Sequence, residues 1–214
     1  VNKWLTQIAH RYYRHLHYDV KKLDALFQPD WHKQKLSVTV AQYVNGKISN
    51  AEVEQVLSEF STQSASLLKT LLPNTRVTVL FHAASLCLFI SQPSQAINWL
   101  NILIHQTDIS VRPGAQAAAR LLYLVAHQEL GNKNIMPSLV ASTKRFYQKT
   151  KLITEVEEGL FNFFLQWAKL APPKEEKKAF QQLKAEAEKN WIPDDFLRAK
   201  LSQVHFEFWM KRNL

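Results

Sequence analysis

The sequence predicts an all-α protein in which antiparallel helix pairs stack into an α-solenoid. Two features of the composition favour helices: the 214 residues include only four glycines, and the eight prolines lie mostly where helices would begin or end. Both features disfavour a turn-rich all-β domain. The third observation is a repeat, because similar helix breaks recur every 40 residues. A hydrophobic content of 46% is ample for a core, so we expect one folded domain over residues 1–214.

The helix pair at residues 112–146 shows this pattern most clearly. Pro113 suits a first helical position, where its missing N–H is one of the donors that stay unpaired in any helix. Gly131 supplies the left-handed backbone conformation that commonly ends a helix. Residues 117–119 are all alanine, which lets another helix approach closely. The apolar side chains between the two ends follow helical spacing: Leu121, Leu124 and Val125.

Comparable helix breaks lie on both sides of this pair. Ile90, Leu130 and Leu170 are 40 residues apart, and each begins a break that contains proline or glycine. Every break is followed by a helical pattern of 14 to 17 residues. Periods of this size with two helices per unit are typical of solenoids, whose units bury one face only by stacking on their neighbours. We therefore expect a repeat core over residues 75–190.

Residues 1–72 are predicted to form degenerate N-terminal helices. The first covers residues 2–27 and ends at Pro29, because a proline disfavours helical backbone at the residue before it. A second helix is expected at residues 30–46. The β-branched run at residues 38–40 leaves a short strand open as the alternative there.

Two further helices complete the expected domain. Ser49 and Glu52 have the spacing of a capping box, in which each side chain satisfies a backbone N–H at the start of a helix. The helix that they open is expected to reach Leu72. Residues 194–212 are predicted to form a closing helix on the last pair, with charged residues outside. Its expected inward side chains are Phe196, Leu197, Leu201, Val204 and Phe208.

One family resembles this chain in particular residues. Ala84 and Ala96, 12 residues apart on successive expected helices, match the two small positions where the helices of a tetratricopeptide repeat pack together. The stretch AARLLYLVAHQELGN, followed by SLVASTKRFYQK and then Glu157, is similar to the C-terminal region of uncharacterised bacterial tetratricopeptide-like proteins. The resemblance covers about residues 75–190. It implies a right-handed α-solenoid with a concave surface for binding protein or peptide. The period near 40 departs from the family's period of about 34.

Cysteine content and hydrophobicity restrict the compartment. Cys87 is the single cysteine and lies in an apolar run, so neither a disulfide framework nor a cysteine-rich metal site is expected. No apolar run reaches the roughly 20 residues that cross a bilayer, and no signal-like start is seen. We therefore expect a cytoplasmic protein without a membrane partner. Because the chain begins at Val1 already in helical pattern, it is expected to be the C-terminal part of a longer protein.

The leading functional hypothesis is a non-catalytic interaction module. The sequence lacks Gly-rich phosphate loops and nucleophile motifs, so we expect no enzyme activity and no cofactor. The expected partner is a protein or peptide segment, acidic or extended, held along the first helices of the pairs. The expected binding residues are Arg76, His82, Arg120, Tyr123 and His127.

The alternative is nucleic-acid binding by the N-terminal helix. The net charge is +9, and residues 1–48 hold eight Lys or Arg against three acids. Basic and aromatic residues alternate in HRYYRHLHYD, at residues 10–19, as single-stranded nucleic acid would require. The residues of this alternative site are Arg11, Arg14, His17 and Lys21. A solvated basic helix face and a self-association arm remain open as readings of the same stretch.

A ribonuclease is the catalytic version of this alternative. Arg11 with His17, and Arg120 with His127, fit the loose Arg-x(4-6)-His spacing of helical HEPN ribonucleases. That resemblance implies an arginine on the phosphate and a histidine that assists the 2′-hydroxyl. No metal site is expected, because the histidines at positions 10, 15 and 17 lack the i, i+4 spacing that puts two ligands on one helical face.

Overall fold

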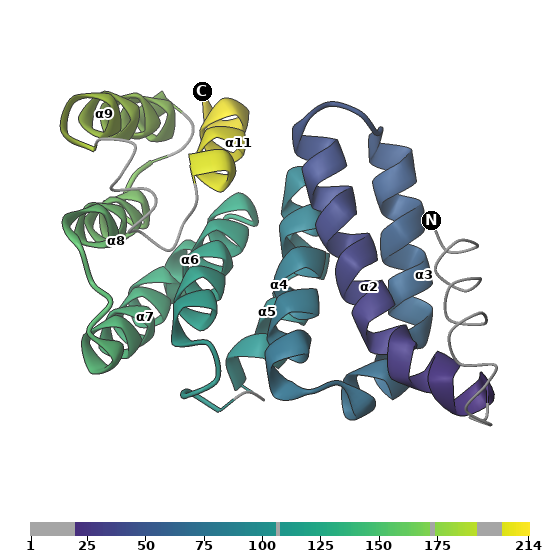
Figure 1. Cartoon of the computed structure of the whole chain (residues 1–214). Helices are drawn as coiled ribbons and strands as arrows, with labels where there is room; N and C mark the ends of the chain where they lie inside the picture. The colour runs from purple at the N-terminus through teal and green to yellow at the C-terminus, as the bar shows by residue number, and fades with distance from the viewer. Residues whose placement is uncertain (1–19, 106–107, 172–173, 192–202) are drawn as a thin grey trace.

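The computed structural model describes residues 20–105, 108–171, 174–191 and 203–214, and within these ranges every regular element is a helix (Figure 1). The first elements are α2 (Val20–Val44), α3 (Asn50–Thr70), α4 (Pro73–Phe89) and α5 (Pro93–His105). The others are α6 (Pro113–Glu129), the 3-10 turn η1 (Lys133–Ile135), α7 (Met136–Thr150), α8 (Glu155–Trp167), α9 (Lys174–Asn190) and α11 (Gln203–Asn213). The predicted all-α class is therefore confirmed for the described residues.

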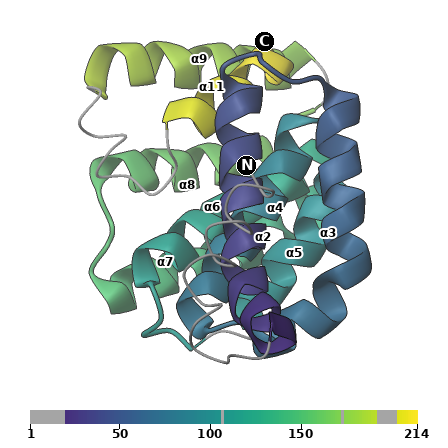
Figure 2. The same ribbon diagram turned by 45° about the vertical axis from the view of Figure 1, so that its right-hand side comes forward.

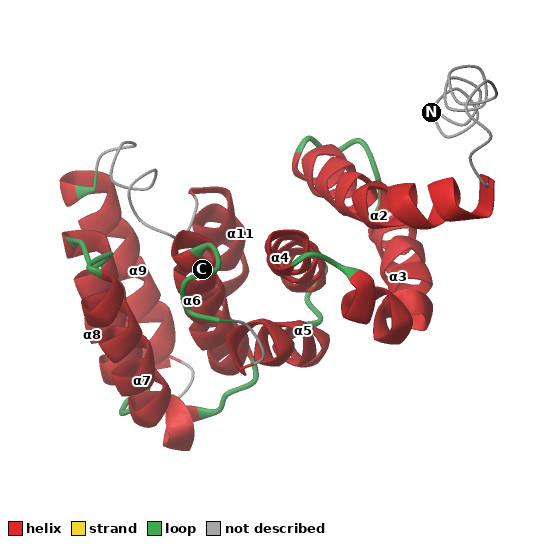
Figure 3. Ribbon diagram, turned by 60° about the horizontal axis from the view of Figure 1, so that its bottom comes forward, coloured by secondary structure: helices red, strands yellow, loops and turns green. Residues whose placement is uncertain are grey.

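Helices that follow one another in the chain pack side by side from α2 to α9. Contacts also join α2 to α4 and α4 to α6, so these alternate helices are neighbours. Figure 3 shows α2 and α3 at one side of the molecule and α7, α8 and α9 at the other, with α4, α5 and α6 between them. The last helix departs from this order, because α11 lies against both α9 and α4 (Figures 1 and 2).

Local signals place most helix ends where the structure has them. Pro73 and Pro113 stand at the first positions of α4 and α6. Gly131 has a φ of +71° after α6, the left-handed conformation that a side chain would resist. At the start of α3, the carboxylate of Glu52 accepts the N–H of Ser49 at 2.8 Å while the Ser49 hydroxyl accepts the N–H of Glu52. These ends were predictable because each depends on residues close in sequence.

The predicted helix end at Pro29 is wrong. α2 runs without a break from Val20 to Val44, and its first turns are inclined to the remainder (Figure 3). A proline removes one hydrogen bond from a helix and bends it, which packing of the rest of the helix can outweigh. Leu36, which is 1% exposed, supplies part of that packing. The strand alternative at residues 38–40 is also excluded: Thr39 is helical and donates its hydroxyl to the Lys35 carbonyl at 2.7 Å.

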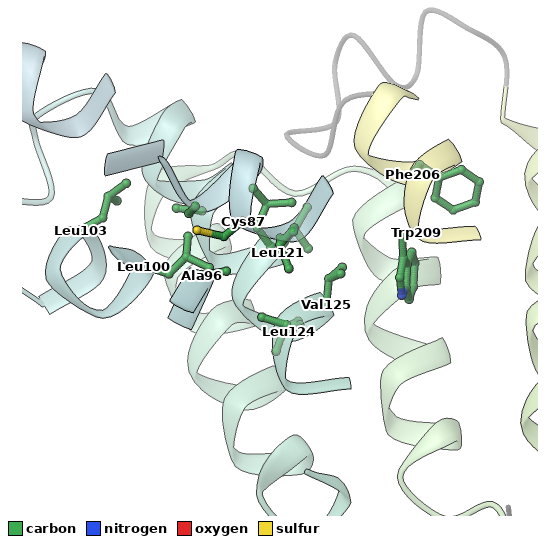
Figure 4. Close-up of a cluster of buried hydrophobic side chains, with 14 of the residues drawn as sticks. Cys87, Ala96, Leu100, Leu103, Leu121, Leu124, Val125, Phe206 and Trp209 are labelled. Atoms are coloured by element: carbon green, nitrogen blue, oxygen red, sulfur yellow. The ribbon is translucent and has the colours of Figure 1, made fainter. Parts of the chain in front are cut away.

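The core is densest around α4, because α2, α5 and α6 all pack against it. Ala84 and Ala96 are both fully buried, as expected for small residues on two closely packed helices. Cys87 lies in this core beside leucines of α5 and α6 (Figure 4). The fully buried side chains of α4, α5 and α6 include Leu80, Leu86, Leu100, Leu103, Leu121 and Leu124.

The closing helix predicted over residues 194–212 overlaps α11, and its residues 194–202 lie outside the described ranges. A helix that only closed the stack would contact the last pair, whereas α11 also reaches α4. Its main buried side chain is Trp209, which is 1% exposed, and Phe208 is half-buried. Within the described ranges no helix combines the length and apolar character of a membrane span. The cytoplasmic location stays a prediction.

Candidate interaction surface

Trp209 anchors α11 among aromatic rings of α8 and α9. Its ring stacks on Phe164 with centroids 5.4 Å apart and meets Phe180 at 5.3 Å with the planes nearly perpendicular. Phe163 contacts the same ring edge-on at 5.5 Å. The indole N–H donates to the amide oxygen of Gln128 on α6 at 2.7 Å, so the polar atom of this buried ring is satisfied. One side chain therefore joins the four helices α6, α8, α9 and α11.

Polar contacts attach the other side of α11 to α4 and α6. The Nε2 atom of His205 lies 2.9 Å from the hydroxyl of Ser85 on α4. Arg212 donates to the carbonyl of Leu88 at 2.6 Å and to the carboxylate of Glu129 on α6. Burial raises the pKa of Glu129, and the nearby Arg212 guanidinium opposes that shift. α11 is thus held by charge and hydrogen bonds as well as by apolar burial.

Phe208 extends these contacts to α2. Its ring lies 4.7 Å from Phe89 of α4 and 5.9 Å from Tyr43 of α2, measured between ring centroids. Tyr43 stacks on Phe89 and donates its hydroxyl to the Phe89 carbonyl at 3.2 Å. We call the side chains of the other helices that α11 touches the α11-binding face. Its main members are Tyr43, Ser85, Phe89, Gln128, Glu129, Phe163, Phe164 and Phe180.

One stripe of α4 leads from this face to a group of basic residues. Thr78, His82, Ser85 and Phe89 are separated by three or four residues, so they lie along one side of α4. Ser85 and Phe89 belong to the α11-binding face, and His82 and Thr78 lie nearer the start of the helix. Arg112, just before α6, donates to the Thr78 hydroxyl. Each of these contacts lies on the side of α4 that also carries α11.

α2 completes the basic group through Ser37, which contacts His82 of α4. The Ser37 hydroxyl lies 2.9 Å from Nδ1 of His82 and bonds to the Lys33 carbonyl at 2.8 Å. We call Lys33, His82 and Arg112 the basic cluster. Burial, together with the charges of Arg112 and Lys33, lowers the pKa of His82 to about 4. The imidazole is therefore neutral near pH 7, and the cluster carries two positive charges.

Neither charge of the cluster is neutralised within the described part of the chain. Lys33 and Arg112 form no ion pair there, whereas Lys35, Lys133 and Arg212 each pair with a carboxylate. Arg112 is exposed and Lys33 is half-buried. Arg112 also has a φ of +48°, a left-handed conformation that costs roughly 1 kcal/mol or more for a residue with a side chain.

The five predicted partner-binding residues are not gathered on one surface. His82 belongs to the basic cluster between α2 and α4. Arg76 shares its side of α4 with Leu80 and Ala83, which are fully buried, and its Nε atom is buried without a hydrogen-bond partner among the described residues. Arg120 lies on α6, with its guanidinium 4.2 Å from the ring centre of Phe146 on α7. Figure 3 shows α2 and α7 on opposite sides of the molecule.

The remaining two predicted residues share the Arg120 side of α6. Tyr123 and His127 meet edge to face with ring centroids 4.5 Å apart. Burial raises the pKa of Tyr123, a shift opposed by its hydrogen bond with Asn101, and burial lowers the pKa of His127 and of Arg120. Nδ1 of His127 lies 2.9 Å from the amide nitrogen of Asn132. Contacts between helices account for these residues, and their role in binding a partner stays a prediction.

The alternative nucleic-acid site falls mainly outside the described ranges. Arg11, Arg14 and His17 precede residue 20, while Lys21 lies in the first turn of α2. For the parts that the structure describes, no group of three or more His, Cys, Asp or Glu residues is arranged to hold a metal ion. Nucleic-acid binding and the ribonuclease reading therefore stay predictions.

Comparison with known proteins gives no relative that could assign a function. No family model matches the chain, no curated protein is significantly similar to it, and no solved structure matches its fold. The features that bear on function are therefore the geometry of α11 and that of the basic cluster. Sequence reasoning missed Lys33, Arg112 and Trp209. Trp209 carried a signal, since Phe206, Trp209 and Met210 follow helical spacing, but Lys33 and Arg112 meet only in three dimensions.

Proposed function

We propose that this protein is a non-catalytic interaction module of the tetratricopeptide-like α-solenoid type. In this proposal α2, α4, α6 and α8 form the inner row of helices, and a protein segment binds along that row. The contacts of α4 with both α2 and α6 support such a row. The 40-residue period of the breaks supports it as well, since stacked units of a solenoid repeat at a constant spacing.

The observation that carries the proposal is the position of α11. A terminal helix lies across the helix stack and contacts side chains of α2, α4, α6, α8 and α9. It presents Trp209 to an aromatic pocket of side chains and Arg212 to a carboxylate, which are the residue types that commonly anchor protein interfaces. The same side of the helices is therefore suited to bind an amphipathic helix or an extended segment of a partner. α11 is a helix of this chain that binds there.

Photo-cross-linking from defined positions tests this proposal. A photoreactive amino acid replaces Thr78 on the inner side of α4 in one full-length variant, and exposed Gln148 on α7 in a matched variant. Both proteins are irradiated in extract of the source cells, and the products are identified by mass spectrometry. We expect a discrete cross-linked protein from position 78 and none from position 148. The identified protein is then purified and titrated with the intact chain by calorimetry.

Three results would contradict the proposal. Equal cross-linking from both positions would show adventitious contact, and a purified partner that does not bind in the titration would remove the inner side as its site. Conversion of the cross-linked protein into a modified product on incubation would show catalysis, which the proposal excludes.

A further inference from the structure

We propose that the basic cluster of Lys33, His82 and Arg112 binds acidic side chains of a partner protein segment. This inference rests on the proposed function and names the chemistry of the partner at the inner side of α4. The proposal places the acidic residues beside the N-terminal half of α4, near Thr78 and His82. A partner helix or strand would thus pass next to α11 and place its carboxylates between α2 and α6.

The geometry of the cluster is the first support. Arg112 is held by the Thr78 hydroxyl, and Thr78 lies one turn before His82 on the same side of α4. His82 is held by Ser37, whose hydroxyl also bonds to the Lys33 carbonyl one turn earlier in α2. Hydrogen bonds therefore hold the Arg112 guanidinium and the His82 imidazole before any partner arrives, which reduces the entropy lost on binding. Lys33 lies one turn before Ser37 on α2, close enough for its charge to lower the pKa of His82.

The free charges are the second support. Cations in this protein that meet another helix commonly have a carboxylate, as in Lys35 with Glu59, Lys144 with Glu158 and Arg212 with Glu129. Lys33 and Arg112 lack such a partner within the described residues. Arg112 is exposed and donates one N–H to the Thr78 hydroxyl. A guanidinium has five donors in a planar fork, so it retains donors that match a carboxylate.

The number of charges favours an acidic peptide over nucleic acid. Two cations neutralise one or two carboxylates, whereas a DNA-binding interface can use about 6–10 phosphate contacts. The neutral His82 and the hydroxyls of Ser37 and Thr78 are short, polar groups suited to hydrogen bonds with carboxylates and backbone. His82 carries the one ring among these five residues, and that ring already contacts Ser37 and Phe81 within the protein.

Fluorescence anisotropy with defined probes tests the inference. The probes are a fluorescein-labelled peptide of eight glutamates, the same peptide made of glutamine, and an RNA of eight uridines. The intact chain is compared with Lys33→Gln/Arg112→Gln and with Lys149→Gln/Lys178→Gln. The second variant removes the same net charge at two exposed positions of α7 and α9. Far-UV circular dichroism checks that each variant is folded.

We expect the glutamate peptide to bind the intact chain at low salt, and the cluster variant to bind it about tenfold more weakly. The α7/α9 variant is expected to bind it as the intact chain does. Added salt should weaken binding, because dissolved ions screen the attraction between the exposed Arg112 and a carboxylate.

Four results would overturn the inference. They are no binding of the glutamate peptide, equal loss in both variants, equally tight binding of the glutamine peptide, and tighter binding of the RNA that depends on the cluster. Failure here leaves position-specific cross-linking at residue 78 unaffected, so the two proposals fail separately.

Discussion

Trp209 donates its indole N–H to the side-chain oxygen of Gln128 at 2.7 Å, across 81 residues of sequence. Both side chains are buried. The bond joins the last helix of the chain to α6, while the Trp209 ring contacts α8 and α9. Gln128 also donates to Asn213 at 3.2 Å, so it binds α11 at two points. We therefore expect α11 to contribute to the stability of the fold.

Loss of the Trp209 ring is expected to destabilise the protein strongly. Trp209→Ala should lower the free energy of unfolding by about 3–5 kcal/mol, the range for removal of a large buried aromatic ring. Trp209→Phe and Gln128→Leu, combined in a double-mutant cycle, should show a coupling of about 1 kcal/mol for the hydrogen bond. Urea denaturation followed by circular dichroism measures each value. Exposed Lys211→Ala is the control, and strictly additive single effects would show that the bond contributes nothing.

Acid is expected to weaken the packing around α4 and α11. Burial and the adjacent charge of His82 lower the pKa of His205 to about 4, and His82 has its pKa lowered to about 4 by burial, Arg112 and Lys33. Between about pH 6.5 and pH 4 the unfolded chain therefore binds more protons than the folded one. The stability that depends on these neutral rings is complete above pH 6.5 and is lost as the pH falls toward 4.

Urea midpoints measured from pH 7.5 to pH 4.5 check this expectation. In His205→Gln the fall in stability over that range should be smaller than in the unchanged protein. Carboxylates whose pKa is lowered, such as Glu52 and Glu59, also cost stability in acid, but they are common to both proteins. Parallel curves for the two proteins would show that His205 does not titrate in this range.

Gly159 in α8 is expected to tolerate no side chain. A Cβ atom there would lie 2.7 Å from Cζ2 of Trp191, a large ring that is 7% exposed. Gly159→Ala should therefore lower the unfolding free energy by about 1–3 kcal/mol. In the background of Trp191→Leu the same change should be neutral or stabilising, because alanine is the better helix former. Calorimetric melting of the unchanged protein, the two single variants and the double variant measures these effects. An equal effect of Gly159→Ala in both backgrounds would refute the clash with Trp191.

Cys87 is expected to be unreactive in the folded protein. Burial raises the pKa of its thiol to about 12, and the side chain is fully buried in the core around α4. Because the thiolate is the reactive form, labelling by a disulfide reagent at pH 8 should require unfolding. The labelling rate should rise with urea in parallel with the unfolding transition. Rapid labelling of the native protein would contradict the burial of this residue.

Helix ends were the most predictable part of the fold. Pro113, Gly131 and the pair Ser49 and Glu52 act through backbone groups a few residues away, so a short stretch of sequence contains the whole interaction. Pro29 shows where this local reasoning fails. Its lost hydrogen bond is a local cost, but the packing of α2 against α3 and α4 is a tertiary gain that continues the helix.

The candidate site was less predictable than the helices. A helix such as α6 has neighbouring helices on several sides. Each of its polar residues can therefore face any one of those neighbours instead of a binding surface. Arg120 was predicted to line a binding surface, yet its guanidinium covers the ring of Phe146. Lys33 lies on α2 and Arg112 lies just before α6, and only their common approach to α4 makes them a cluster.

The sequence by itself determined that the described chain is helical and where most of its helices begin and end, because propensity and capping are local. It also indicated which side chains would be buried, since apolar residues recur at helical spacing. The tertiary structure alone decided that Trp209 meets Gln128 and that Lys33 and Arg112 flank His82. The physical reason is that hydrophobic burial has no direction, so a sequence shows that a ring must leave water but not which helix will cover it.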